Sequence, residues 1–509
     1  MVVSTSNQAS AVKERAVVVG AGIGGLTAAA LLAHRGYKVK VYDQAIVPGG
    51  CASTFKRKGF TFDVGATQVA GLEPGGIHRQ IFEELDIELP AASECDPACA
   101  VFLPGETEPI NVWRDPDKWA TERERQFPGS TPFWALMKKL FDASWRFQQR
   151  DPVLPPRNGW DLWQLTSALR PDTLITVPFT FSTVGQLLKV LGLYSDRRLR
   201  TFLDMQLKLY SQTTADKTAL LYAATALGVS QAPQGLFHLK GSMQVLSDRL
   251  VEAIERDGGE LHMRHTVEAV MPGDRGSFQV RVANKKNTWL EPADHVVANV
   301  TVQNLVKLTD SNRMGIYERR LKSLPSPSGA FVIYLGVTEA AVPEGCPPHL
   351  QFLYDYDGPI AENNSLFVSV SRPGDGRAPE GMATIIASSF TDVQPWYDCD
   401  EVGYKSIKAA YTKAALSRLK DYFDLRPDHI VHTEAATPRS FETFTARENG
   451  IVGGVGQRVP TFGPFGFATR TPIKNLWLVG DSTHPGEGTA GVSYSALTAV
   501  RQIEAGKSR

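Results

Sequence analysis

The sequence contains little cysteine, no surplus of either charge and no long apolar run. Its five cysteines among 509 residues are too few and too scattered for a disulfide scaffold. Lys and Arg together number 54, as do Asp and Glu, so the chain lacks the basic surplus typical of a nucleic-acid-binding protein. No stretch approaches the roughly 20 apolar residues of a membrane-spanning helix, and residues 1–10 lack the charged start and apolar core of a signal peptide.

The length and the few cysteines also limit the architecture. A chain of 509 residues is too long for one compact core, so two connected domains are expected. Cys95 and Cys99 have a spacing that can begin a metal site, but no second pair of Cys or His follows at a suitable spacing, so no metal is expected. The low cysteine content fits a reducing, cytosolic environment.

A glycine-rich turn near the N-terminus predicts a dinucleotide site. The apolar run Ala16–Val19 is typical of a buried parallel strand. Gly20, Gly22 and Gly25 follow it: the first permits a tight turn, the second lets a pyrophosphate approach the backbone, and the third lets the next helix pack closely. That helix is expected to begin at about Gly24, and its free N–H groups would face the phosphates.

The residues after this turn complete a strand–helix–strand unit. The helix is expected to end at His34, and Lys38–Tyr42 is the second predicted strand. Asp43 ends that strand, where a carboxylate accepts hydrogen bonds from the adenosine ribose and disfavours a 2′-phosphate. Gly49 and Gly50 then favour a backbone that closes over the cofactor.

A second glycine-bearing loop lies close to the C-terminus. Leu476–Val479 is a predicted strand, and Gly480 and Asp481 follow at its carboxyl end. Gly491 and Val492 then open a helix of small residues, which gives a second helix N-terminus aimed at the cofactor. A nicotinamide enzyme has no need of a second loop so far from the first, so the two loops together predict FAD.

We therefore predict an α/β protein in which a Rossmann-like FAD-binding domain is interleaved with an α+β substrate domain of helices and an antiparallel sheet. The FAD-binding domain is assigned residues 11–99, 230–300 and 436–509. The substrate-binding and membrane-associating domain is assigned residues 100–229 and 301–435. Strands of its sheet are expected at Ala330–Gly336, Ser365–Ser371 and Met382–Ser388.

The middle of the chain suits a large apolar ligand. Its many aromatic residues favour an apolar tunnel, because a hydrocarbon gains affinity mainly by removing area from water, at roughly 25 cal/mol per Å². Residues 171–181 are unusually apolar between two prolines. We predict that they lie on a bilayer surface where a lipid-soluble substrate enters, and a buried helix pair is the alternative.

Three stretches of the sequence resemble a known family. VVVGAGIGGLTAAALLAHRGYKVKVYDQ, PGGCASTF and GFTFDVGATQ together resemble the FAD-dependent phytoene desaturases and carotenoid isomerases, related more distantly to amine oxidases. Within that family, GGCASTFKRKGFTFDVGATQVAGLEPGGIH resembles the cyanobacterial carotenoid C-3′,4′ desaturases. Many relatives carry Arg after the paired glycines, whereas this chain has Cys51, as the isomerases and this desaturase group do.

The resemblance implies an activity, partners and some residue roles. It implies desaturation at C-3′,4′ of a monocyclic, gamma-carotene-type or myxol-type carotenoid, with hydride transfer to flavin N5 and a quinone or oxygen as electron acceptor. The apolar segment 171–181 and the low cysteine content, rather than the resemblance, are the basis for expecting a peripheral location on the cytoplasmic face of a membrane. The resemblance places Asp481 at the ribityl chain or pyrophosphate, Gly491 and Val492 near the flavin ring, and the backbone of Val267 near the adenine.

The reaction and its proton acceptor are left open by the residues. A carotenoid cis–trans isomerase that uses reduced FAD, a non-catalytic carotenoid or flavin carrier and, less favoured, an amine oxidase are the alternatives. Polar residues expected near the flavin are candidates for proton transfer, although each also has a purely structural interpretation. These candidates are His484, Glu487, Tyr494 and Arg439.

Overall fold

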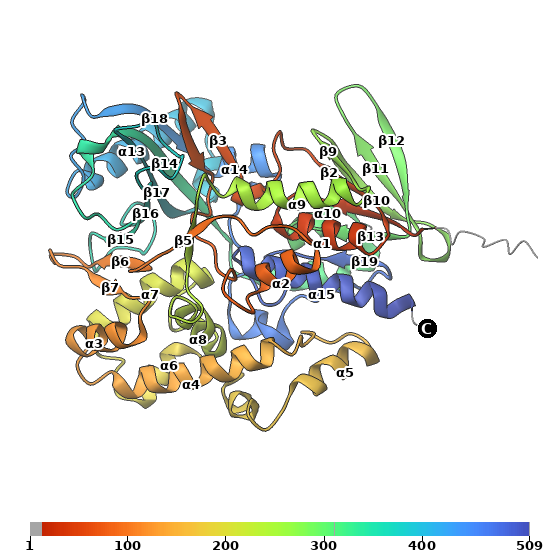
Figure 1. Cartoon of the computed structure of the whole chain (residues 1–509), viewed down its shortest axis with the longest axis horizontal. Coiled ribbons are helices and arrows are strands. Elements are labelled where there is room, and N and C mark those ends of the chain that lie inside the picture. The colour runs from red at the N-terminus through yellow and green to blue at the C-terminus, as the bar shows by residue number, and fades with distance from the viewer. Residues whose placement is uncertain (1–12, 310, 508–509) are drawn as a thin grey trace, which may run out of the picture.

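The computed structural model describes residues 13–309 and 311–507, so the prediction that concerned residues 1–10 lies outside the described residues. Figure 1 shows a parallel sheet with its helices on one side of the molecule, a second sheet on the other side, and a layer of helices below them. Within the described ranges, no helix is both long and apolar enough to cross a membrane.

The parallel sheet is assembled from distant parts of the chain. Its order is β19-β13-β1-β2-β9, and all neighbouring strands run parallel. Both predicted N-terminal strands are confirmed, with Val18 paired to Val41 on one side and to Val297 on the other. The strands are β1 (Arg15–Val19), β2 (Lys38–Asp43), β9 (Glu260–Met263), β13 (His295–Ala298) and β19 (Leu476–Leu478).

Layers of secondary structure cover both faces of this sheet. Val18 packs with the helices of one face, whereas Val17 and Val19 pack with the elements of the other, as the alternation of a strand requires. The first face is covered by α1 (Ile23–His34), α2 (Ile77–Glu84), α9 (Gln244–Arg256) and α15 (Thr489–Lys507). The second face is covered by β10 (Thr266–Pro272), β11 (Phe278–Ala283), β12 (Thr288–Ala293), α10 (Val302–Leu308) and α11 (Ser311–Lys322).

Helices α10 and α11 depart from the expected division. They fall within the range 301–435 assigned to the substrate domain, yet Val302, Leu305 and Met314 pack against the parallel sheet. The chain therefore leaves the cofactor sheet only after α11, although the domain boundaries themselves stay a prediction.

The antiparallel sheet expected for the substrate domain is present within a seven-stranded sheet. Its order is β18-β14-β17-β16-β15-β6-β7, and only β15 and β6 are parallel neighbours. Helix α13 packs on one face, and Phe60 and Phe62 of β4 pack on the other. The elements are β4 (Phe60–Asp63), β6 (Cys99–Phe102), β7 (Ile110–Val112), β14 (Ser328–Thr338), β15 (His349–Leu353), β16 (Ser365–Val370), β17 (Met382–Asp392), α13 (Glu401–Leu419) and β18 (Ile430–Ala436).

A layer of helices from residues 116–228 lies against this sheet (Figure 1). Many of its aromatic residues, such as Trp119, Phe133 and Phe202, form its own core. The 3₁₀ helix η2 has no buried residue, so the alternative of a buried helix pair at 171–181 is wrong. The helices are α3 (Pro116–Gln126), α4 (Thr131–Gln148), α5 (Gly159–Ala168), η2 (Leu174–Phe179), α6 (Val184–Val190), α7 (Arg197–Ser211) and α8 (Leu220–Gly228).

Short elements complete the described chain. They are η1 (Gly50–Ala52), β3 (Thr54–Arg57), β5 (Ala92–Glu94), β8 (Phe237–Leu239), η3 (Asp274–Gly276), η4 (Glu339–Ala341), α12 (Gln394–Tyr397), α14 (Pro438–Thr445), η5 (Glu448–Gly450), η6 (Val459–Thr461) and η7 (Gly463–Phe465).

A buried ion pair joins β4 to the loop before β17. Asp63, at the end of β4, accepts a hydrogen bond from the Arg377 guanidinium at 3.0 Å and a second one from the Met243 amide at 2.8 Å. The Arg377 carbonyl in turn accepts a bond from the Thr61 amide. Because both charged side chains are buried, they depend on each other for compensation, and this contact holds β4 and the start of α9 against the loop before β17.

Candidate functional site

A cavity of about 1010 Å³ runs between the two sheets. One end is lined by the turn after β1, the end of β2, the paired glycines and the loops around β19 and α15. The other end is lined by α4, α8, η2 and the face of the seven-stranded sheet. The two glycine loops predicted to hold the cofactor therefore open into the space that the substrate domain encloses.

The glycine turn after β1 is required by close backbone contacts. Gly20 has a φ of +98°, which disfavours any residue with a side chain. A Cβ atom on Gly25 would lie 2.0 Å from the Gly20 carbonyl oxygen. Helix α1 begins at Gly22 without a side-chain cap, so its N-terminal amides are available to an anion in the cavity.

Asp43 lies at the end of β2 on the cavity wall. Its two carboxylate oxygens accept hydrogen bonds from the amides of Ala21 and Ala45, both at 2.7 Å. Burial raises the pKa of Asp43, and these two amides oppose the shift. The carboxylate thus stabilises the glycine turn, and each oxygen keeps a lone pair for the predicted ribose contact.

The paired glycines close over the same turn. Gly49 has a φ of +114° and Gly50 a φ of +59°, and the Gly49 amide donates to the Ala21 carbonyl at 2.8 Å. A Cβ atom on Gly50 would lie 3.4 Å from the Cα atom of Gly22. Both glycines line the cavity, as a backbone that closes over a cofactor would.

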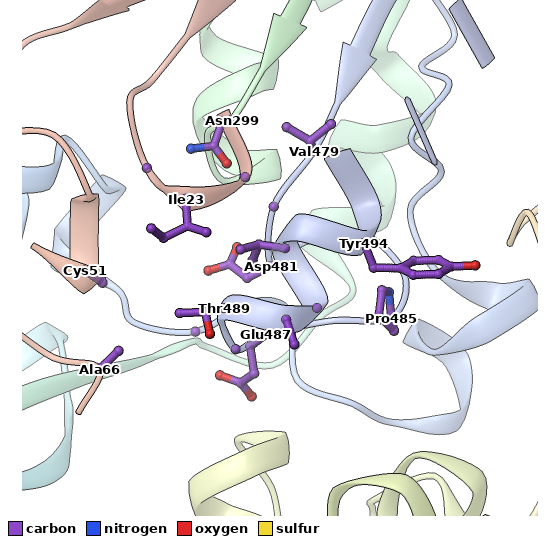
Figure 2. A pocket seen from close by; sticks show the side chains of 18 of the residues that line it. Ile23, Cys51, Ala66, Asn299, Val479, Asp481, Pro485, Glu487, Thr489 and Tyr494 are labelled. Atoms are coloured by element: carbon purple, nitrogen blue, oxygen red, sulfur yellow. The ribbon is translucent and has the colours of Figure 1, made fainter. Parts of the chain in front are cut away.

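The C-terminal loop reaches the cavity from the opposite side. Gly480 has a φ of +108°, and its amide donates to the Ser495 hydroxyl at 2.9 Å. A Cβ atom on Gly24 of α1 would lie 3.2 Å from the Val492 carbonyl, so the first turns of α1 and α15 are in close contact. Figure 2 shows Asp481 between Ile23 of α1 and Thr489 of α15.

Asn299 was missed as a site residue in the sequence. It follows β13, and its side chain fills the space that the glycines leave open (Figure 2). A Cβ atom on Gly22 would lie 2.7 Å from the Asn299 Nδ2 atom, and one on Gly24 would lie 2.8 Å from its Oδ1 atom. No local pattern marks this asparagine, because its contacts are with residues almost 280 positions away.

Arg447 was also missed. Its guanidinium pairs with the Asp481 carboxylate at 2.7 Å, and both residues line the cavity. Burial lowers the pKa of Arg447, but Asp481 and other nearby groups outweigh this and raise it overall. Arg447 and Asp481 therefore neutralise each other's charge beside the C-terminal loop, and both can still form hydrogen bonds.

Glu487 is the proton-transfer candidate whose carboxyl group has the most unusual environment. Burial raises its pKa to about 8, although a hydrogen bond from the Gln212 side chain at 2.9 Å lowers the pKa in part. Its Oε1 atom has no hydrogen-bond partner among the described residues. In Figure 2 its carboxyl group points away from Asn299, toward the helical layer that encloses the apolar end.

The other candidates differ in position. His484 and Tyr494 line the cavity; burial lowers the pKa of His484 to about 4 and raises that of Tyr494 well above its usual range. Arg439 does not line the cavity, which corrects its selection as a residue near the flavin. Its guanidinium donates to the carbonyls of Trp396 and Cys399, since α14 turns it toward α12.

The other predicted cofactor residues are brought to one cavity, with one exception. Gly25 is not in the cavity wall and acts through helix packing. The predicted residues that do line the wall are Gly20, Gly22, Gly24, Asp43, Gly49, Gly50, Val267, Gly480, Asp481, Gly491 and Val492.

Fold and site together define a dinucleotide-binding oxidoreductase. The family model of flavin containing amine oxidoreductases matches residues 23–504, so the chain belongs to this family. It is an FAD-dependent oxidoreductase.

Named relatives span almost the whole chain. The zeta-carotene-forming phytoene desaturase of Myxococcus xanthus is 28% identical over 519 residues, which cover 97% of this chain and 95% of that protein. The chloroplastic prolycopene isomerase 2 of an Oncidium hybrid cultivar is 25% identical over 511 residues, covering 96% of this chain and 84% of that protein. Putrescine oxidase bound to putrescine has the same fold, with a TM-score of 0.62 at 15% identity, covering 98% of this chain and 100% of the solved one.

The residues at the cavity fit FAD. An uncapped helix N-terminus and glycines with positive φ suit a pyrophosphate that approaches the backbone closely. Buried polar atoms on the wall, among them Oε1 of Gln212 and Nε2 of Gln148, lack partners in the described chain and are free to bond a ligand. We propose that the lining residues named above hold the cofactor.

Replacing Asp481 by Ala should release FAD. The change leaves the Arg447 cation buried without its carboxylate, in addition to removing any direct cofactor contact. We expect the purified variant to lose most of its flavin absorbance near 450 nm relative to 280 nm. Asp142→Ala, on an exposed ion pair of α4, is the control and should remain yellow. Full flavin content in Asp481→Ala would remove this residue from the cofactor site.

Proposed function

We propose that this protein is an FAD-dependent carotenoid desaturase. In this proposal it oxidises a C–C single bond of a long apolar polyene, a monocyclic gamma-carotene-type or myxol-type carotenoid, at the C-3′,4′ position, and a quinone or oxygen accepts the electrons. Relatives named as carotenoid desaturases and isomerases support the substrate class. The position of the bond rests on the sequence resemblance.

One observation carries the proposal: the cavity continues from the cofactor loops into an apolar chamber. Aromatic side chains of the helical layer and the sheet line this chamber, and they include Trp145, Phe147, Tyr222, Phe367 and Phe390. An apolar chamber of this kind favours a hydrocarbon ligand through burial of its surface.

The residues of the chain have distinct tasks in this reaction. FAD, when bound, supplies a two-electron acceptor. The aromatic wall orients the polyene and excludes water from the reacting bond. The oxidation also frees a proton from the neighbouring carbon, and Glu487 is placed to take it as a general base in its ionised form.

The isomerase alternative is favoured by one specific observation. Because the pKa of Glu487 is about 8, its carboxyl group is protonated at neutral pH and can donate a proton to a polyene. A proton given and taken back at this residue would permit rotation about a double bond with no net oxidation. The two functions therefore require opposite protonation states of the same side chain.

We propose in addition that the cavity opens at a membrane surface. Leu169 and Val177 line the cavity and are also exposed, and Trp163 and Phe181 beside them are 67% and 69% exposed. An exposed apolar patch at a cavity mouth suits a substrate that is dissolved in lipid. The protein would then lie peripherally on the cytoplasmic face of a membrane.

Expression in a carotenoid-producing bacterium tests the function directly. Pigments extracted from cells that accumulate gamma-carotene should shift to the red and lose two hydrogens in mass. A product of equal mass but changed isomer composition would indicate the isomerase instead. Unchanged pigment in cells that contain the flavin-loaded protein would contradict both and favour a carrier.

The dependence of the rate on pH separates the two functions. For the desaturase, the rate should fall about tenfold per pH unit below 8, because the base form of Glu487 becomes scarce. For the isomerase, the rate should fall above pH 8 as the proton is lost. Glu487→Gln should lower the rate about 100-fold and remove this profile, whereas Glu122→Gln, a buried glutamate of α3 outside the cavity, should change neither. A profile that persists in Glu487→Gln would rule this residue out.

The membrane proposal is tested by flotation with liposomes. The double variant Trp163→Ser and Phe181→Ser should float several-fold less than the wild type, because the apolar contact with lipid is removed. Val402→Ser, at an equally exposed position on α13, is the matched control and should float normally. Equal flotation of all three proteins would contradict the proposal.

A further inference from the structure

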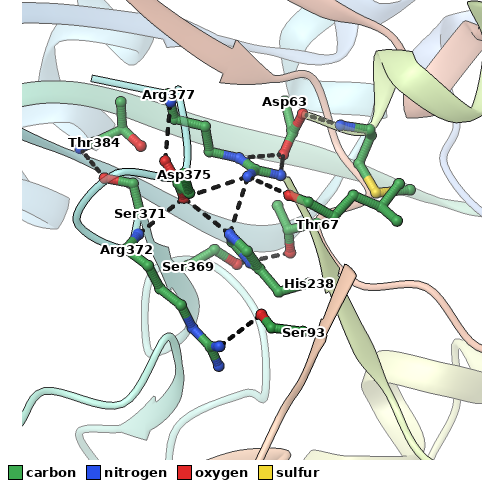
Figure 3. Close-up of polar contacts among 12 residues, drawn as sticks. Asp63, Thr67, Ser93, His238, Ser369, Ser371, Arg372, Asp375, Arg377 and Thr384 are labelled. Carbon is green, nitrogen blue, oxygen red and sulfur yellow. Dashed lines mark hydrogen bonds and ion pairs between the residues drawn. The ribbon is translucent and has the colours of Figure 1, made fainter. Parts of the chain in front are cut away.

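A file of polar side chains leads away from the cavity wall beneath the seven-stranded sheet. Thr67, in the loop after β4, lines the cavity, and its hydroxyl bonds the Ser369 hydroxyl at 2.7 Å (Figure 3). Ser369 on β16 is paired in register with His349 on β15, whose Nδ1 atom lies 3.2 Å from the Ser369 oxygen. The file thus joins the cavity to a fully buried histidine.

A second file leads from another buried histidine to the surface. The Nε2 atom of His238, on β8, lies 2.9 Å from an Asp375 carboxylate oxygen, and the Arg377 guanidinium lies 2.9 Å from the same nitrogen as a second, donating partner. The Arg372 amide donates to that same oxygen, and the Arg372 guanidinium donates to the hydroxyl of the exposed Ser93 at 2.7 Å (Figure 3). Gly374 and Gly376 on either side of Asp375 are exposed, so this carboxylate lies directly beneath the surface.

The two files meet at the two histidines. The ring centroids of His349 and His238 are 6.0 Å apart. Nε2 of His349 and Nδ1 of His238 are both buried and have no hydrogen-bond partner in the described part of the chain. Buried nitrogens of this kind are normally satisfied, and one water molecule between the rings would satisfy both.

We propose that this file conducts protons between the cavity and the solvent, through one water molecule between His349 and His238. The proposal rests on the proposed oxidation, in which the substrate loses a hydride to FAD and a proton from the neighbouring carbon. The electron pair of the second C–H bond becomes the new double bond, and the freed proton must leave a cavity whose proposed mouth is apolar and faces lipid rather than water. Thr67, Ser369 and the two histidines would carry it to Asp375 and the surface.

The surrounding charges suit a relay. Burial lowers the pKa of both histidines, so each is neutral at rest and offers one N–H donor and one acceptor nitrogen. Arg372 and Arg377 also disfavour protonation of His238, whereas the Asp375 carboxylate favours it. Asp63 pairs with Arg377 and neutralises that cation. Arg377 nevertheless contacts both His238 Nε2, at 2.9 Å, and the Asp375 carboxylate, at 3.3 Å, and it opposes a proton on the histidine. A proton that reaches His238 is therefore stabilised by Asp375 against this cation, and it passes on readily.

Flash reduction of the FAD-loaded protein by an external photoreductant tests the relay. Protonation of the newly reduced flavin is followed by its absorbance change, and no carotenoid is needed, so this test does not depend on the substrate. We expect Thr67→Val, which keeps the shape and removes the hydroxyl, to slow this protonation at least tenfold. Thr67→Ser, which restores the hydroxyl, should protonate at the wild-type rate. A larger solvent deuterium isotope effect in the valine variant is also expected.

Variants at the middle of the file complete the test. His349→Phe should slow protonation as much as Thr67→Val does, and Ser369→Ala decides the point if the phenylalanine variant fails to fold. His295→Phe replaces another buried histidine with an unpartnered nitrogen, outside the file and outside the cavity wall, and should protonate normally. Wild-type protonation rates in Thr67→Val and in a folded variant of His349 or Ser369 would overturn the relay, as would equal slowing in His295→Phe. Normal protonation in the wild type with no carotenoid turnover would instead contradict the proposed function alone.

Discussion

The structure depends on the close packing of α1 against α15 around Asn299. Gly24 and Gly25 admit this packing because a Cβ atom at either position would collide with Asn299 or with the Gly20 carbonyl. The Thr27 and Ser493 hydroxyls lie 3.2 Å apart across the same interface. As a result, two helix N-termini from opposite ends of the chain face one cavity, where both favour an anion such as a pyrophosphate.

The substrate domain follows from this arrangement. The chain passes between the cofactor domain and the seven-stranded sheet several times. The sheet is therefore connected to the cofactor domain at more than one place. The buried Asp63–Arg377 pair ties β4 and the start of α9 to the loop before β17. Phe60 and Phe62 pack on the face of the same sheet. These contacts hold the apolar chamber directly beside the cofactor loops, which a flavin oxidation of a hydrocarbon requires.

Local signals in the sequence predicted most of the glycine loops that the structure brings to the cavity. The spacing of Gly20, Gly22 and Gly25 carries its own steric explanation, and strand periodicity located the parallel and antiparallel strands. The residues that the sequence did not predict make long-range contacts. Asn299 and Arg447 act through partners far away in sequence, and no local pattern reveals them. Arg439 was selected for its charge, but the turn of α14 directs it to backbone carbonyls.

Polar contacts between distant strands and loops were equally impossible to predict from the sequence. Thr67 and Ser369 are 302 residues apart, and His238 and Asp375 are 137 apart. Each is an ordinary residue for its strand or loop, and only the pairing of distant strands brings them together. Helices α10 and α11 show the same limit, because their apolar residues pack against the parallel sheet through contacts with residues far away in the sequence.

A crystal structure of the protein with FAD and a C40 carotenoid would test the central claim most directly. We predict that the pyrophosphate lies at the N-terminus of α1, that the flavin ring lies between the paired glycines and the start of α15, and that the polyene lies along Trp145 and Phe147. A flavin bound elsewhere, or a polyene outside the cavity, would contradict the account.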